Sequence, residues 1–178
     1  MMGTLTLIPK PCFKCGLSKT RKKQVVGRGV LPCQVLFIGE GPGKSEDCQG
    51  TAFFGSSGEL LNDAINLFSG GNVPSYFITN VVQCRPTDNM DGPNRQPSIE
   101  EALACQPNLM SVYKRANPAA VVLLGKVAAR HTIRLFDCRV FRLDHPAFIL
   151  RKGGRKSPMF IAFARNLQQI FQGVQNVS

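Results

Sequence analysis

Apolar positions along this chain alternate between short runs typical of buried strands and stripes typical of amphipathic helices. Four segments have the strand pattern, and helical segments lie between and after them. This alternation predicts right-handed crossovers and an α/β fold, a three-layer α/β/α arrangement around a central, mostly parallel four-stranded sheet. The predicted strands are residues 34–38, 76–79, 119–124 and 139–143, and the predicted helices are 57–68, a helix capped at 98, 126–136 and 158–172.

Polar or glycine-rich segments follow three of these strands. Gly39 opens a Gly/Pro-rich loop after the first strand, Asn80 closes the second, and His145 follows the fourth. Ligands of parallel α/β sheets bind beyond the carboxyl ends of the strands. We therefore expect the Gly39 loop, Asn80 and His145 to meet at one cleft.

The chain of 178 residues carries 22 basic and 11 acidic residues, for a net charge of +11. Its length fits one domain, residues 1–178, and no apolar run approaches the ~20 residues of a membrane span. Positive charge clusters at residues 19–23 and 151–156, which favours a nucleic-acid partner over a merely basic soluble protein. Without a signal-peptide pattern, we expect a cytoplasmic monomer that does not bind membranes.

Four of the seven cysteines have spacings that suit a metal site. Cys12 and Cys15 form a C-x2-C pair, Cys84 ends an apolar run, and Cys105 lies in the helix that Ser98 caps. An odd count excludes a complete disulfide framework within one chain, and a reducing compartment favours metal binding. Four thiolates suit either a [4Fe–4S] cluster or a zinc ion, and unligated buried thiols are a third interpretation.

The segment from Gly39 to Ser45 contains the Gly-Lys-Ser that ends a phosphate-binding P-loop. That motif requires four residues between its first glycine and Gly-Lys, and here only Glu40, Gly41 and Pro42 intervene. Pro42 also removes a backbone N–H that would bind phosphate. The sequence therefore argues against a nucleotide hydrolase, and a functional role explains the acidic Glu40 on this turn better than a place in the core.

Several motifs, taken in order, resemble the family 4 (iron–sulfur) uracil-DNA glycosylases. Besides the cysteines, residues 39–55 match Gly-Glu-x-Pro-Gly-x-x-Glu-Asp-x-x-Gly-x-x-Phe-x-Gly, Asn80 closes its strand, and residues 145–151 match His-Pro-Ala-x-x-Leu-Arg. The resemblance runs from Cys12 to about Phe171. It implies a uracil-DNA glycosylase fold and an enzyme that hydrolytically removes uracil from single- or double-stranded DNA in base excision repair.

The resemblance also implies roles for three residues in catalysis. Asn80 reads the base, since its amide offers N–H to uracil O4 and C=O to N3–H. His145 donates to uracil O2, where negative charge develops, and Glu40 positions water, stabilises the cationic sugar, or does both. The other implied residues are the substrate contacts Gly41, Glu46, Phe53, Ile149 and Arg151 and the [4Fe–4S] ligands Cys12, Cys15, Cys84 and Cys105.

For three of the implied substrate contacts, we expect a specific role in holding the DNA. Phe53 is expected to stack on the extruded base. The apolar run Phe148–Leu150, which contains Ile149, is expected to fill the vacated base stack, and Arg151 with Lys152 to contact phosphates.

The match departs from the family in two places. The loop 87–93 looks like an insertion, which leaves either Asn89 or Asn94 as the equivalent of a family asparagine. The segment between Gly125 and His145 is shorter than the corresponding segment that members of the family carry before the His-Pro motif. A domain trimmed in this way is either a compact enzyme or a non-catalytic iron–sulfur DNA-binding module associated with replication.

Overall fold

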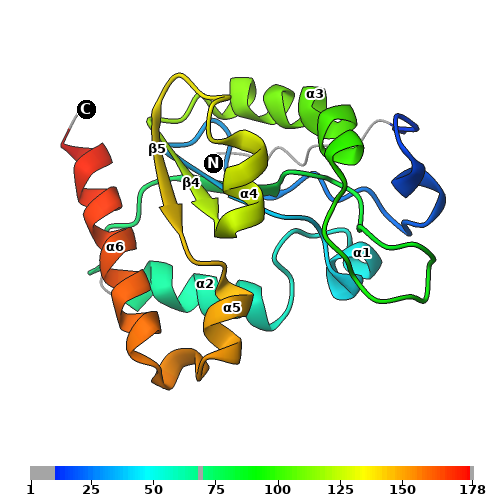
Figure 1. Cartoon of the computed structure of the whole chain (residues 1–178). Helices are drawn as coiled ribbons and strands as arrows, with labels where there is room; N and C mark the ends of the chain where they lie inside the picture. The colour runs from blue at the N-terminus through cyan, green and yellow to red at the C-terminus, as the bar shows by residue number, and fades with distance from the viewer. Residues whose placement is uncertain (1–10, 68–69, 177–178) are drawn as a thin grey trace.

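The computed structural model describes residues 11–67 and 70–176 and is centred on a five-stranded sheet (Figure 1). The strand order is β1-β3-β2-β4-β5, and every neighbouring pair is parallel except β1 with β3. None of the described helices is long and apolar enough to cross a bilayer. The strands are β1 (Arg28–Gly29), β2 (Val35–Gly39), β3 (Tyr76–Asn80), β4 (Ala120–Leu124) and β5 (Arg139–Leu143). The helices are η1 (Gly16–Lys19), α1 (Lys44–Gln49), α2 (Ser56–Leu67), α3 (Ile99–Ala116), α4 (Gly125–Thr132), α5 (Pro146–Arg151), η2 (Gly154–Lys156) and α6 (Pro158–Gln175).

Alternate side chains of the parallel strands point to opposite faces of the sheet, and helices cover both faces. On one face, Val35, Phe37 and Val122 belong to a buried cluster with residues of α2, α5 and α6. On the other face, Leu36 and Leu123 belong to a second cluster with residues of α3 and α4. Figure 1 shows the two helical layers on either side of the sheet. The predicted three-layer α/β fold class is therefore confirmed.

The number of strands differs from the prediction. The four predicted strands are present, each with boundaries within one residue of those expected, and β1 adds a fifth, antiparallel strand at the edge of the sheet. Two residues are too few to show the alternation that identifies a strand in a sequence. The pairing of β1 with β3 depends on glycine, because a Cβ on Gly29 would overlap the Tyr76 carbonyl.

Helix boundaries agree with the sequence where capping chemistry marks them. Helix α3 begins after Ser98, whose hydroxyl accepts the Glu101 N–H at 3.2 Å, while the Glu101 carboxylate accepts the Ser98 N–H at 2.9 Å. Helix α4 ends at Thr132, earlier than predicted, because the chain tightens there into a turn in which the Leu135 N–H bonds to the Thr132 carbonyl. Phe68, the last residue of the predicted helix 57–68, lies outside the described residues.

A buried carboxylate ties the basic segment near the N-terminus to the Gly-rich loop. Asp47 of α1 is 1% exposed and accepts the backbone N–H of Lys22 at 2.9 and 3.0 Å and that of Lys23 at 3.2 Å. These bonds satisfy a carboxylate that would be costly to bury alone. Asp47 therefore has a structural role in holding residues 22–23 against α1.

Candidate active site

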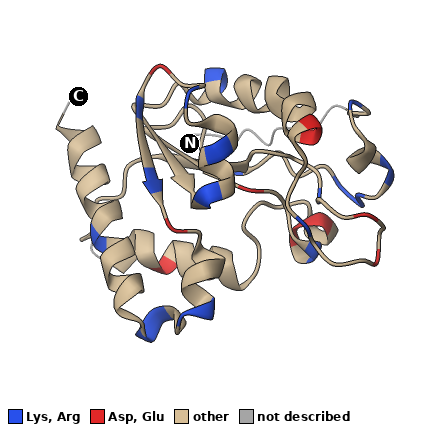
Figure 2. Cartoon of the chain, viewed as in Figure 1, with Lys and Arg blue, Asp and Glu red and all other residues tan. Residues whose placement is uncertain are grey.

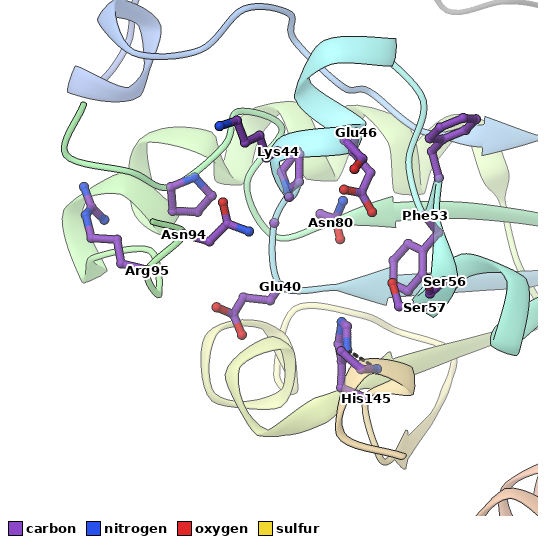
Figure 3. A pocket seen from close by; sticks show the side chains of 18 of the residues that line it. Glu40, Lys44, Glu46, Phe53, Ser56, Ser57, Asn80, Asn94, Arg95 and His145 are labelled. Atoms are coloured by element: carbon purple, nitrogen blue, oxygen red, sulfur yellow. Dashed lines mark hydrogen bonds between the residues drawn. The ribbon is translucent and has the colours of Figure 1, made fainter. Parts of the chain in front are cut away.

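A cavity of about 570 Å³ lies where the parallel strands end, between segments that are far apart in the sequence (Figure 3). The loop after β2, the end of β3, the loop before α3 and the start of α5 all contribute to its wall. Glu40, Asn80 and His145 line it, so the structure brings these three sequence-predicted residues together. The predicted substrate contacts that also line it are Gly41, Glu46, Phe53 and Arg151.

Asn80 can lie at this cavity because the neighbouring strand ends in glycine. A Cβ on Gly39 would lie 2.5 Å from Asn80 Oδ1 and 2.7 Å from the Phe53 ring. Asn80 is 2% exposed, and its side-chain amide forms no hydrogen bond with another residue in the described part of the chain. A nearly buried amide without a protein partner is costly unless a ligand or water pairs with it. Asn80 is therefore a candidate ligand-reading group.

Phe53 reaches the cavity through a backbone conformation that few non-glycine residues adopt, with φ of 52°. Its carbonyl packs closely against α2 at Gly58, where a Cβ would overlap it. The Phe53 ring stacks on the His145 imidazole, with ring centroids 5.6 Å apart and an interplanar angle of 29°. Strained backbone of this kind persists only where surrounding contacts hold it, and it is common at binding sites.

The tautomer of His145 is set by the helix that it caps. Its Nδ1 accepts the Ala147 N–H at 3.1 Å at the start of α5. The ring proton therefore lies on Nε2, from which no described residue accepts a hydrogen bond. Burial, with a smaller contribution from the positive charge of Arg151, lowers the pKa of His145 to about 4. At neutral pH the side chain is thus a neutral imidazole with one N–H free to donate.

Two half-buried carboxylates line the same cavity (Figure 3). Burial raises the pKa of Glu40 above its ordinary value. Burial also raises the pKa of Glu46, although the backbone N–H of Gly43 acts in the opposite direction. A carboxylate whose pKa is raised is a better proton acceptor near neutral pH, so both side chains suit acid–base chemistry or the stabilisation of positive charge.

A buried arginine that sequence analysis missed organises the loop before α3. Arg85 is 2% exposed, and its Nε donates to Asn94 Oδ1 at 2.6 Å. Its Nη1 donates to the Met90 carbonyl at 2.9 Å, and its Nη2 donates to the Gly92 carbonyl. One guanidinium thus holds three points of the loop, which a planar group with five N–H donors can do.

This contact also fixes the orientation of the Asn94 amide. Because Oδ1 is bonded to Arg85, Nδ2 is directed to the opposite side, where a Cβ on Gly43 would lie 3.4 Å from it. Asn94 lines the cavity, whereas Asn89 does not. Of the two asparagines that the sequence left as alternatives, Asn94 is therefore the one placed at the site.

Comparison with known proteins agrees with this geometry. Residues 26–168 match the model of the uracil DNA glycosylase superfamily. The chain belongs to this superfamily. It is 33% identical to the "Type-4 uracil-DNA glycosylase" of Pyrobaculum aerophilum, over 92% of this chain and 90% of that protein. It is 36% identical to the protein of that name from Saccharolobus solfataricus, over 78% of this chain and 63% of the relative. The identity to that of Archaeoglobus fulgidus is 33%, over 82% and 71%. The predicted family is confirmed.

A second hollow in this member of the uracil DNA glycosylase superfamily is lined by the four cysteines that the resemblance implied as ligands, Cys12, Cys15, Cys84 and Cys105. Two nitrogen donors point at their sulfurs. Arg21 Nη1 lies 2.9 Å from Cys84 Sγ, and Asn108 Nδ2 lies 3.5 Å from Cys12 Sγ and 3.9 Å from Cys105 Sγ. Donors of this kind stabilise thiolates and are typical of the surroundings of metal-bound sulfur.

The four thiols line one hollow. Among the described residues, no group of three or more His, Cys, Asp or Glu side chains could hold a metal ion. A [4Fe–4S] cluster differs from a zinc ion, because each thiolate binds its own iron at a separate corner of the cluster. The donor set of four thiols suits a [4Fe–4S] cluster, and an all-cysteine zinc site would use the same four thiols.

One predicted substrate contact does not lie in the cavity. Ile149 is 0% exposed and packs in the core with α2 and α6, so the expectation that it fills a vacated base stack is corrected. The cause is that residues 146–151 form helix α5, which turns Ile149 inward and Phe148 outward. Phe148 is 36% exposed, and the Lys152 ammonium lies 5.8 Å from its ring centroid. Of the predicted apolar run, Phe148 is the exposed member.

Proposed function

We propose that this protein removes uracil from DNA by hydrolysing the bond between the base and its sugar. The proposal rests on one arrangement, in which an unpaired amide, an imidazole N–H and a half-buried carboxylate line the same cavity. A base inside a duplex cannot reach such a cavity, so the nucleotide is first extruded from the stack. The relatives' name, "Type-4 uracil-DNA glycosylase", supports the same activity for this chain.

In this proposal Asn80 reads the extruded base. Its amide N–H donates to uracil O4 and its carbonyl accepts from N3–H, whereas cytosine presents the opposite polarity at both positions. Phe53 stacks on the base and also supports the imidazole of His145. The support for this role is that the Asn80 amide is nearly buried and bonds to no other described residue.

His145 stabilises the leaving base. When the glycosidic bond breaks, its electron pair stays with uracil, and negative charge develops on O2. The Nε2–H of a neutral imidazole donates to that oxygen, while Nδ1 remains bonded to the Ala147 N–H. A donor that is already aimed needs no reorganisation during the reaction, and losing one such donor typically costs about 10²–10³-fold in rate.

Glu40 acts on the sugar side of the reaction. As uracil leaves, C1′ becomes cationic and a water molecule adds to it, losing a proton. The Glu40 carboxylate stabilises that positive charge or accepts the proton, and burial raises its pKa in the direction that favours proton transfer. The Nδ2 of Asn94 offers a second polar group at the same cavity.

The phosphates next to the extruded nucleotide are proposed to contact Arg151 and Lys152. Arg151 lines the cavity, and both side chains are exposed. Each phosphate that a cation neutralises releases counterions, so DNA binding should weaken with salt.

We also propose that the four cysteines hold a [4Fe–4S] cluster. The donors Arg21 and Asn108 beside their sulfurs support bound thiolates. When bound, the cluster supplies a cross-link between the N-terminal segment, the loop after β3 and helix α3. The two hollows share no lining residue, so no step of base removal is assigned to it. Zinc is the alternative that elemental analysis distinguishes.

Single-turnover release of uracil by Asn80→Ala and His145→Ala tests the proposed roles. Each variant should lose about 10²–10³-fold, and the double variant less than the product, because both residues act on the same leaving base. Asn89→Ala is the matched control, since Asn89 is exposed and does not line the cavity. DNA affinity should change little, because phosphate contacts dominate it.

Two results would contradict this account. Asn80→Ala and His145→Ala variants that release uracil at the wild-type rate would remove the assigned roles. Folded wild-type protein that binds DNA but releases no uracil would instead favour the non-catalytic DNA-binding module.

A further inference from the structure

We propose that a basic groove between α4 and β5 binds the phosphate backbone of the substrate DNA beyond the extruded nucleotide. The groove has a volume of about 590 Å³, and its basic lining residues are Lys126, Arg130, His131, Arg134 and Arg142. It is separate from the two basic segments, residues 19–23 and 151–156, that the sequence marked as candidates. The inference rests on the proposed function, because it assumes that DNA is the ligand of the neighbouring cavity.

The charge of this groove is not neutralised by any of the described residues. Among residues 11–67 and 70–176, no acidic side chain lines it. Lys126, Arg130, Arg134 and Arg142 are exposed, and none makes an ion pair or side-chain hydrogen bond in the part of the chain that the structure describes. Four unpaired cations around one hollow repel one another, and a polyanion that enters it relieves this repulsion. The groove therefore has the chemistry of a site for phosphates.

Helix α4 explains how the cations come to share one side. Its residues Ala128 and Ala129 are buried in the cluster that packs on the sheet, whereas Lys126 and Arg130 are four residues apart and lie on one face of the helix. Arg134 follows four residues later, in the turn after the helix. Figure 2 shows the basic parts of α4 and β5 in blue on the same side of the molecule.

Strand β5 supplies the opposite wall of the groove. Phe141 and Leu143 pack toward α2, α5 and α6, and Val140 packs toward α3 and α4. Because side chains alternate along a strand, Arg142 points to the same side as Val140, toward α4. β5 is the last strand in the sheet order. Two acidic residues, Asp137 and Asp144, flank this strand in the sequence, and neither lines the groove.

The groove adjoins a hollow that reaches the residues beside His145 of the proposed active site. Gly125 packs against His145, since a Cβ there would lie 3.0 Å from His145 Cβ. Gly125 also lines an intermediate hollow of about 510 Å³, which shares Lys126 and Arg142 with the basic groove. A DNA strand that leaves the His145 side of the cavity thus meets a hollow lined by two cations, Lys126 and Arg142, and by one acidic residue, Asp144.

The length of the cationic stripe fits several phosphates. Lys126 and Arg130 are about 6 Å apart along the axis of α4 at the rise of an α-helix, and Arg134 extends the stripe into the turn that follows. Phosphates of one strand of duplex DNA are about 3.4 Å apart along its axis, so the helical part of the stripe alone covers about two base-pair steps. Each contact contributes about 0.9 to the slope of log affinity against log salt, and removing two cations should lower that slope by up to about 1.8.

The test compares two variants with the same change in net charge. Arg130→Gln/Arg134→Gln removes two cations of the groove, and Lys114→Gln/Arg115→Gln removes two exposed cations from the last turn of α3. The probes are an uncleavable uracil-analogue duplex with long flanks and a shortened one that ends a few base pairs beyond the analogue. Affinity is measured over a range of salt concentrations, and excision is measured at saturating protein with a cleavable duplex.

We expect the groove variant to bind the long duplex more weakly and with a smaller salt slope than the control. On the shortened duplex, the two variants should bind alike. Excision at saturating protein should match wild type, because neither arginine lines the cavity. A groove variant whose salt slope on the long duplex equals that of the control would overturn the inference, even if uracil is released normally. Absence of uracil release by the wild-type protein would count against the proposed function alone. The salt slopes measured on uncleavable DNA would still show whether the groove binds phosphates.

Discussion

Replacing Gly39 by alanine should disturb the site without removing any group from it. The new Cβ would lie 2.5 Å from Asn80 Oδ1 and 2.7 Å from the Phe53 ring, where ordinary contact begins at 3.4 Å. The amide, the ring or both must therefore move by about 0.7–0.9 Å, and a misplacement of about 1 Å can cost 10²-fold in rate. Overpacking of a filled site also costs about 1–3 kcal/mol of stability.

The assay is single-turnover uracil release at saturating protein, with Gly16→Ala as the control, because a Cβ on Gly16 meets nothing within 4 Å. Gly39→Ala should release uracil about 10²-fold more slowly than Gly16→Ala, with unchanged DNA affinity. Adding Gly39→Ala to Asn80→Ala should cost less than Gly39→Ala costs alone, because the displaced amide is already gone. A Gly39→Ala protein that is folded and within twofold of wild type would refute the claim that the position of the Asn80 amide controls excision.

Three further predictions concern other parts of the molecule. The pKa of about 4 for His145 predicts an imidazole that stays neutral above about pH 5.5, with its proton on Nε2. Nitrogen-15 NMR should show this protonation state, and a titration near the ordinary value of about 6.5 would contradict it. Arg85→Met leaves Asn94 Oδ1 and two loop carbonyls without a donor, so it should lower the free energy of unfolding by about 2–3 kcal/mol and slow excision. Urea titrations measure the stability, and an unchanged value would contradict the anchoring role of Arg85. Cys84→Ser should reduce iron content and thermal stability more than Cys138→Ser, because Cys138 does not line the cysteine hollow. Stoichiometric zinc without iron in the wild-type protein would contradict the proposed cluster.

The parts of the fold and site that sequence patterns predicted are those that depend on short-range rules. Apolar runs located the four parallel strands, and parallel strands end at one edge, so Asn80 and His145 could be placed in one cleft. The Ser98 and Glu101 spacing located the start of α3 because a capping box is complete within four residues.

The features that were missed depend on contacts across the chain or on very short elements. β1 has two residues and α5 has six, too few for a period to be detected, and α5 is what turns Ile149 into the core. Burial of Arg85 requires residues 90–94 to wrap round it, which no local pattern predicts. The one local signal was an arginine directly after the apolar run that ends at Cys84.

Release of free uracil from DNA tests the proposed glycosylase activity directly. Wild-type protein, checked for fold by circular dichroism and for iron content, is incubated with oligonucleotides that contain a single uracil, and alkali then cleaves any abasic site. Matched strands with cytosine or thymine at the same position are the controls. We expect cleavage at uracil and none at the control bases. Intact uracil strands in both single- and double-stranded DNA, with folded and iron-loaded protein that binds them, would contradict it.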